Sequence, residues 1–155
     1  MASSCVRHAL VVSWALFALA PNTTRAAEPS FAVIAAADAT GHRLSKETVA
    51  LIFTRKQLFW EDRLRIQPVN LPSTHPLRRA FSQVILGSSP EGFEDYWREM
   101  YFQGVLPPHV VGSEEAVALF VESTPGGIGY VSTCIPARKV VVVYVSGSSL
   151  PVCLK

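Results

Sequence analysis

The sequence predicts an α/β fold, in which helices cover a mixed sheet. Strand-like and helix-like segments alternate in the order β-α-β-α-α-α-β-β. The last of them, Lys139–Val145 (KVVVVYV), is a continuous β-branched run typical of a strand buried on both faces. A chain of 155 residues that is 49% hydrophobic and 17% charged also suits one globular domain.

The first 26 residues are expected to be a signal peptide, which leaves residues 27–155 as a single domain. Arg7 and His8 precede an apolar run of about a dozen residues, and the polar segment PNTTRAA follows it. The run is short for a membrane span, which needs about 20 residues. We expect cleavage after Ala26 and a periplasmic location; an uncleaved N-terminal anchor is the alternative.

The charge of the chain gives no support for a polyanionic partner. Without Arg7 and Arg25, the 14 Lys and Arg residues become 12, which balance the 12 Asp and Glu residues that all follow the leader. The basic pI of about 8.5 belongs to the uncleaved chain. The sequence therefore indicates neither a nucleic acid nor an anionic membrane as partner.

Two cysteines remain after the leader. Cys134 and Cys153 are an even pair in a chain expected to reach an oxidising compartment, so a disulfide between them is predicted. Closing this loop would stabilise the chain by about 3 kcal/mol. Two buried free thiols are the alternative.

The N-terminal half begins with a strand and a helix. Phe31–Ala36 (FAVIAA) is an apolar run suited to a buried strand. Ser45 is a plausible N-cap for the following helix. Arg65–Leu71 is the next strand candidate, and Pro68 within it indicates an edge position or a bulge. We expect Val49, Leu51 and Ile52 to form the apolar face of this helix, with Leu44 as a further candidate.

A second helix is predicted after the stretch VNLPSTHPLRRAF. Ser73 or Thr74 can cap it, Pro76 sits where a missing N–H costs least, and Gly87 can end it. The apolar residues at helical spacing are Leu77, Phe81, Val84 and Ile85.

Two further helices and a strand complete the pattern. Ser89 is expected to cap the third helix and Ser113 the fourth, and the turn TPGG leads into a strand at Ile128–Val131. The third helix is expected to bury a stripe of Phe93, Trp97, Met100 and Tyr101. The fourth is expected to bury a combination of Val117, Leu119, Phe120 and Val121.

Several segments resemble the phosphate-type periplasmic substrate-binding proteins, in the order in which that family has them. They are residues 31–71, DYWREMYFQG at 95–104, and GSEEAVALFVESTPGGIGYV at 112–131. The resemblance implies the type II periplasmic-binding fold, in which two lobes hold the ligand between them. The matched segments are those of the second lobe, so we expect a single lobe. It further implies a secreted, non-catalytic relative of the solute-binding components of phosphate ABC transporters.

The same resemblance locates a candidate oxyanion site. In the family, an Arg followed by Asp-Gly-Ser-Gly-Thr binds the anion at a helix N-terminus. Aligned on Phe81, Gly-Ser-Gly-Thr falls on residues 74–77, where the glycines are absent and a proline removes an N–H donor. The candidate contacts that remain are Ser73, Thr74, His75 and Arg78. Alternatively, Ser73 and Thr74 only cap the helix, while Arg78 and Arg79 are solvated or pair with acidic neighbours.

The sequence gives little support for catalysis or metal binding. No G-x-S-x-G motif or catalytic pair stands out, and no enzyme activity or cofactor is expected. His42, His75 and His109 lack the short spacing of a metal site. Two function classes stay open: a binding protein for phosphate or a similar oxyanion, with a membrane transporter as its partner, and an interaction protein without ligand that contacts another periplasmic protein or itself as a homodimer.

Overall fold

The computed structural model describes residues 30–39, 42–132 and 139–147. The predicted signal peptide, Cys134 and Cys153 lie outside these residues, so the disulfide stays a prediction.

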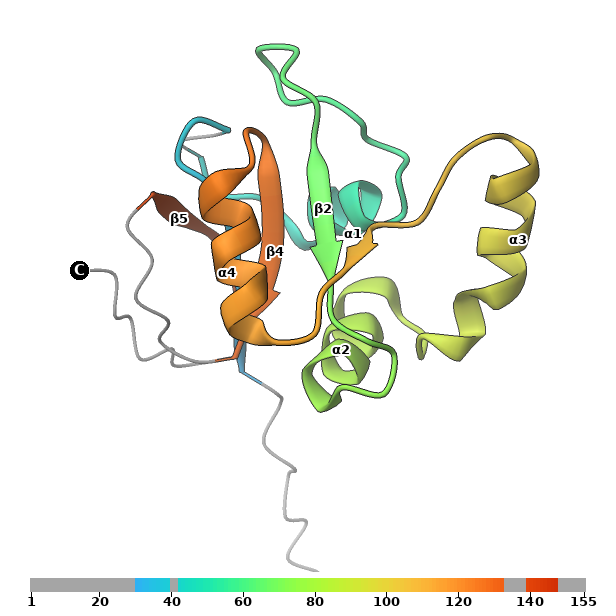
Figure 1. Ribbon diagram of the computed structural model, residues 1–155. Helices are drawn as coiled ribbons and strands as arrows, with labels where there is room; N and C mark the ends of the chain where they lie inside the picture. Colours follow the sequence, from blue (N-terminus) through green and yellow to red (C-terminus); the bar gives the residue numbers. More distant parts are fainter. Residues whose placement is uncertain (1–29, 40–41, 133–138, 148–155) are drawn as a thin grey trace, which may run out of the picture.

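A mixed sheet of five strands forms the centre of the molecule, in the order β3-β2-β4-β1-β5 (Figure 1). Strand β2 runs parallel to β3 and β4, whereas β1 is antiparallel to β4 and β5. The strands are β1 (Phe31–Ala36), β2 (Gln67–Asn70), β3 (His109–Val110), β4 (Gly127–Val131) and β5 (Val140–Ser146). The predicted α/β class is confirmed, and β3 is the only named strand that the sequence did not indicate.

Helices cover both faces of this sheet. Helix α4 covers one face, because a Cβ added to Gly129 would meet the side chains of Val117 and Val121. The next residue, Tyr130, points to the opposite face, where its ring contacts Phe53 and Phe81. The helices are α1 (Lys46–Phe53), α2 (Pro76–Phe81) with a π-helical turn at Ser82–Leu86, a 3-10 turn at Glu91–Phe93, α3 (Glu94–Phe102) and α4 (Glu114–Ser123).

Local chemistry sets the helix ends. The Ser45 hydroxyl accepts a hydrogen bond from the Thr48 N–H at 3.1 Å, and the Ser113 hydroxyl accepts one from the Ala116 N–H at 3.2 Å. Gly87 follows the π-helical turn with φ of 76°, a left-handed conformation that glycine adopts without strain. These predicted caps are confirmed.

The prediction that Lys139–Val145 is buried on both faces is wrong. Strand β5 lies at one end of the sheet order, and Val140, Val143 and Ser146 are its buried residues. A bulge shifts its pairing with β1, and the carbonyl of Val143 accepts a hydrogen bond from the Leu44 N–H at 2.7 Å. A β-branched run therefore identified the strand but not its position, because an edge strand can be equally apolar.

Pro68 lies in a strand that is internal to the sheet, contrary to the predicted edge position. Its neighbour β3 pairs only with Val69 and Asn70, while Pro68 itself pairs with Ile128 of β4. The missing N–H of Pro68 is tolerated because β2 pairs with a neighbouring strand on only one side at this residue.

The predicted buried stripe of α3 is also wrong. No residue of α3 is buried, and Tyr101 is 65% exposed. Figure 1 shows α3 standing apart from the sheet. Leu119 of α4 and Leu51 of α1, both expected in apolar faces, are 66% and 42% exposed. Helical spacing predicts that apolar residues share a face, but it does not show what covers that face.

Candidate functional site

The carboxyl ends of the three parallel strands meet at one edge of the sheet. Strand β2 ends at Asn70, β3 at Val110 and β4 at Val131. The loop after β2 leads into α2, and the loop after β3 leads into α4, so both helices begin at this edge. Ligands of open α/β sheets bind outside the carboxyl ends of strands. This carboxyl edge is therefore the candidate site.

Tyr130 organises the floor of the carboxyl edge. Its buried hydroxyl accepts a hydrogen bond from the Leu71 N–H at 3.3 Å and donates one to Asn70 Oδ1 at 3.2 Å. Burial raises the pKa of Tyr130, and the positive charge of Arg78 partly offsets this effect. The phenol is thus a neutral bridge that fixes the end of β2 and the start of the following loop.

His75, rather than Ser73 or Thr74, caps α2. The His75 Nδ1 accepts a hydrogen bond from the Leu77 N–H at 3.2 Å, while the side chains of Ser73 and Thr74 are exposed. Pro76 follows as the first helical residue. The predicted hydroxyl cap is therefore wrong, because the imidazole reaches the orphan N–H first, and both hydroxyls are left facing solvent.

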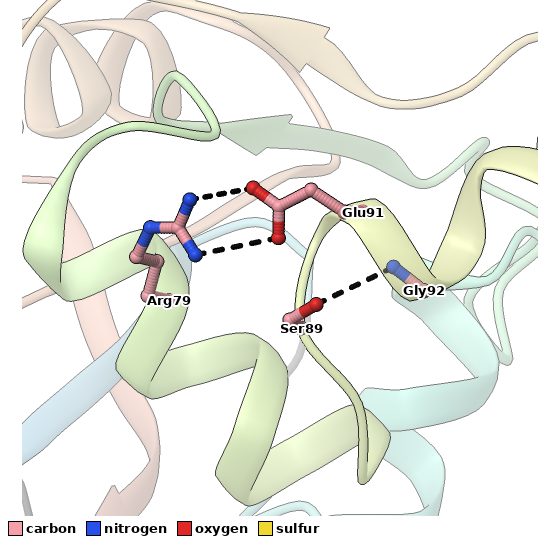
Figure 2. A network of polar contacts seen from close by, with 4 residues as sticks. All are labelled: Arg79, Ser89, Glu91 and Gly92. Atoms are coloured by element: carbon pink, nitrogen blue, oxygen red, sulfur yellow. Dashed lines mark hydrogen bonds and ion pairs between the residues drawn. The ribbon is translucent and has the colours of Figure 1, made fainter.

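The two arginines of α2 have different surroundings. Arg79 forms an exposed ion pair with Glu91 (Figure 2). Hydrogen bonds from the Glu91 backbone and from Ser89 lower the pKa of Glu91, and Arg79 adds to this effect. Arg78 is half-buried, and its Nε is buried without a hydrogen-bond partner among the residues that the structure describes. Of the two, only Arg78 lacks a carboxylate partner in that part of the chain.

A carboxylate already occupies the start of α4. Glu114 accepts hydrogen bonds from the Ser132 N–H at 2.7 Å and from the Ser132 hydroxyl at 2.8 Å. Its negative charge also acts to raise the pKa of Tyr130. Ser113 caps α4 and Glu114 lies in its first turn, so a negative charge already stands near the positive end of this helix. That charge disfavours an oxyanion beside α4 and favours the α2 side of the carboxyl edge.

A separate cavity of about 570 Å³ lies at the carboxyl end of β1, near the start of α1. Its lining includes Asp38, His42, Trp60 and Asp62. The described residues contain no group of three or more His, Cys, Asp or Glu side chains that could hold a metal ion. They also contain no helix long and apolar enough to cross a membrane.

Comparison with known proteins supports the fold. No protein-family model and no curated protein matches the sequence. One similar crystal structure is that of a protein from Clostridium perfringens described as a phosphate ABC transporter substrate-binding protein, with bound phosphate. The two share 17% sequence identity with a TM-score of 0.56, and the match covers 81% of this chain and 47% of that chain. This chain therefore shares the fold of that substrate-binding protein and spans about half of its length.

The four residues predicted to bind an oxyanion lie in two different environments. His75 and Arg78 both lie half-buried on the α2 side of the carboxyl edge, whereas Ser73 and Thr74 lie on the exposed loop before it. Sequence reasoning missed the polar residues that hold this edge together, Asn70, Glu114, Tyr130 and Ser132. No spacing within the sequence signalled them, because they come from separate elements.

Proposed function

We propose that this chain is a non-catalytic solute-binding protein of the phosphate-transport type. Its first 26 residues direct it to the periplasm, and residues 27–155 form one domain. It contacts phosphate or a similar oxyanion weakly at the carboxyl edge and works with a membrane transporter. Likeness of fold to the Clostridium perfringens protein supports this class. Because folds host many functions, the ligand has to be argued from the site residues.

The proposal rests on the unpaired positive charge of Arg78. Its guanidinium is a cation that forms no ion pair with a carboxylate among the described residues. It lies close enough to Tyr130 to affect the pKa of that phenol. The exposed hydroxyls of Ser73 and Thr74 precede it on the loop. An external oxyanion would therefore supply the missing charge partner for Arg78 and take hydrogen bonds from the loop.

Three features make this site weak. Pro76 has no N–H, the Leu77 N–H is already bound to His75, and the negative charge of Glu114 acts on the same phenol, Tyr130, as Arg78 does. One arginine and two solvated hydroxyls then provide most of the affinity. We expect a dissociation constant of about 1 mM, equivalent to about 4 kcal/mol.

Calorimetric titration with phosphate and with sulfate tests the proposal. The variant Arg78→Ala should abolish the heat, whereas Arg79→Ala is the matched control, with the same change of charge one residue away. Arg79 should be dispensable because its side chain is paired with Glu91. No heat up to about 10 mM anion, or an equal loss in both variants, would contradict oxyanion binding at this site.

A second candidate function is supported by α3. This helix presents an apolar face that the rest of the described chain does not bury. An accessory protein that has lost ligand binding, and instead contacts another periplasmic protein, would need such a face. In that case neither phosphate nor sulfate binds, and the function resides in the surface of α3.

A further inference from the structure

The segment that contains α3 is attached to the domain by few contacts. We call residues 89–106 the aromatic arm. Glu91 forms the ion pair with Arg79 of α2, the Tyr96 hydroxyl donates a hydrogen bond to the Thr54 carbonyl at 2.7 Å, and the Lys56 ammonium lies 5.8 Å from the centroid of the Tyr96 ring. Helix α3 has nine residues. Isolated helices shorter than about 12 residues are only marginally stable in water. The arm should therefore gain from a further packing partner.

The arm exposes large apolar side chains. Tyr101 is 65% exposed, Phe102 is 80% exposed and Leu106 is 62% exposed. Trp97 and Met100 are only half-buried beside them. Single exposed apolar residues are ordinary, but a cluster of aromatic residues along one arm is typical of an interaction surface.

The charges of the arm favour a basic partner. Four acidic residues against one basic residue give it a net charge of −3. Asp95 is already paired with Arg98 and Glu91 with Arg79, which leaves Glu94 and Glu99 without an ion pair among the described residues. An anionic membrane surface is therefore disfavoured as the occupant. The acidic residues are Glu91, Glu94, Asp95 and Glu99.

A surface of the required kind lies on the same chain. Residues 54–66, which we call the basic segment, carry four basic and two acidic residues, for a net charge of +2. Lys56, Arg63 and Arg65 are exposed, and Phe59 between them is 50% exposed. The basic segment thus combines an exposed aromatic ring with positive charge, as the arm combines exposed rings with negative charge.

We propose that the occupant is a second copy of this chain. The arm and the basic segment adjoin each other, since Tyr96 touches Thr54 and lies near Lys56. A two-fold axis can then place each arm on the basic segment of the other copy, which pairs opposite charges twice and buries Tyr101 and Phe102 near Phe59. The calculated neutral charge of residues 27–155 does not oppose this association. This inference rests on the interaction alternative above and is independent of oxyanion binding.

Sedimentation equilibrium of the full chain, as recovered from the cell, tests the pairing. A reversible dimer is expected, with weaker association at high salt. Tyr101→Glu should weaken dimerisation by about tenfold or more, because it puts a charge into the apolar centre. Leu119→Glu is the matched control, since Leu119 is 66% exposed but lies on α4. A chain that stays monomeric at about 100 μM, or equal loss in the two variants, would overturn the proposal.

Charge exchange identifies the two surfaces. The double variant Lys56→Glu with Arg65→Glu, and the double variant Glu94→Lys with Glu99→Lys, should each dimerise poorly because like charges then face each other. Mixing them should restore a heterodimer, in which both contacts again join opposite charges. Failure of the mixture to associate, with both variants folded by circular dichroism, would show that the arm binds something other than the basic segment. Phosphate titration of the same variants reports separately on the carboxyl edge.

Discussion

The ring of Tyr130 stacks on the ring of Phe81, with 3.9 Å between the centroids and 6° between the ring planes. Tyr130 belongs to β4 and Phe81 ends α2, so the stack attaches α2 to the sheet. The Tyr130 hydroxyl simultaneously holds Asn70 and Leu71. One side chain therefore positions both ends of the loop that carries Ser73 and Thr74. The buried contacts of Tyr130 therefore hold the carboxyl edge in place.

Removal of the Tyr130 hydroxyl should destabilise the fold while keeping the stack. Tyr130→Phe leaves the buried Leu71 N–H and Asn70 Oδ1 without their partner, which costs about 1–3 kcal/mol of unfolding free energy. Urea denaturation measures this loss. Tyr144→Phe is the matched control on β5, where the ring lies at the margin of the core. Equal stability of the two variants would mean that the hydroxyl has no structural role.

Stability should fall at alkaline pH because of Tyr130. Burial raises its pKa in the folded chain above the unfolded value of about 10. Between these two values the unfolded chain has lost a proton that the folded chain keeps, so unfolding becomes easier as pH rises. The stabilisation is complete below the unfolded pKa and is lost as pH rises through the folded pKa.

Urea denaturation at pH about 8 and about 10.5 measures this slope. In Tyr130→Phe the unfolding free energy should fall less steeply with pH. Part of the fall that remains should come from Tyr96, because burial also raises the pKa of that side chain. Parallel slopes for the wild type and the variant would assign the alkaline effect to other groups.

Local signals in the sequence predicted local structure well. The limits of β1 and the caps at Ser45, Ser113 and Gly87 follow from neighbouring residues, and the structure has them where the sequence placed them. The edge position of β5 and the exposure of α3 depend on which segments meet in space. A single sequence carries no signal for that choice, because apolar periodicity is the same whether a face is covered or free.

The candidate site likewise has residues that the sequence could indicate and contacts that only the fold creates. His75 and Arg78 could be named because they are near one another in the chain. The partner that fixes their surroundings is Tyr130, whose hydroxyl binds Asn70 from 60 residues away. Two arginines side by side also look equivalent in the sequence. Only the fold gives Arg79 its carboxylate and leaves Arg78 without one in the described part of the chain.

Gly129 sets the distance between α4 and the sheet. A Cβ at this position would lie 2.5 Å from Val117 Cγ1 and 2.8 Å from Val69 Cγ1. Gly129→Ala should therefore push α4 outward and lower the unfolding free energy by about 1–3 kcal/mol. Gly112→Ala is the control, because nothing lies within 4 Å of the added carbon. If thermal denaturation shows the same midpoint for both variants, the packing of α4 against β4 is looser than the structure indicates.

The cap of α2 distinguishes the structure from the sequence prediction. His75→Ala removes the acceptor of the Leu77 N–H and should lower the unfolding free energy by about 1 kcal/mol. His75→Asn should keep most of that stability, since asparagine is a good N-cap. Ser73→Ala and Thr74→Ala should be nearly neutral, because both side chains are exposed and neither caps the helix. Urea denaturation of the four variants decides the point: a loss at Ser73 or Thr74 that exceeds the loss at His75 would restore the hydroxyl cap and remove those hydroxyls from the proposed oxyanion site.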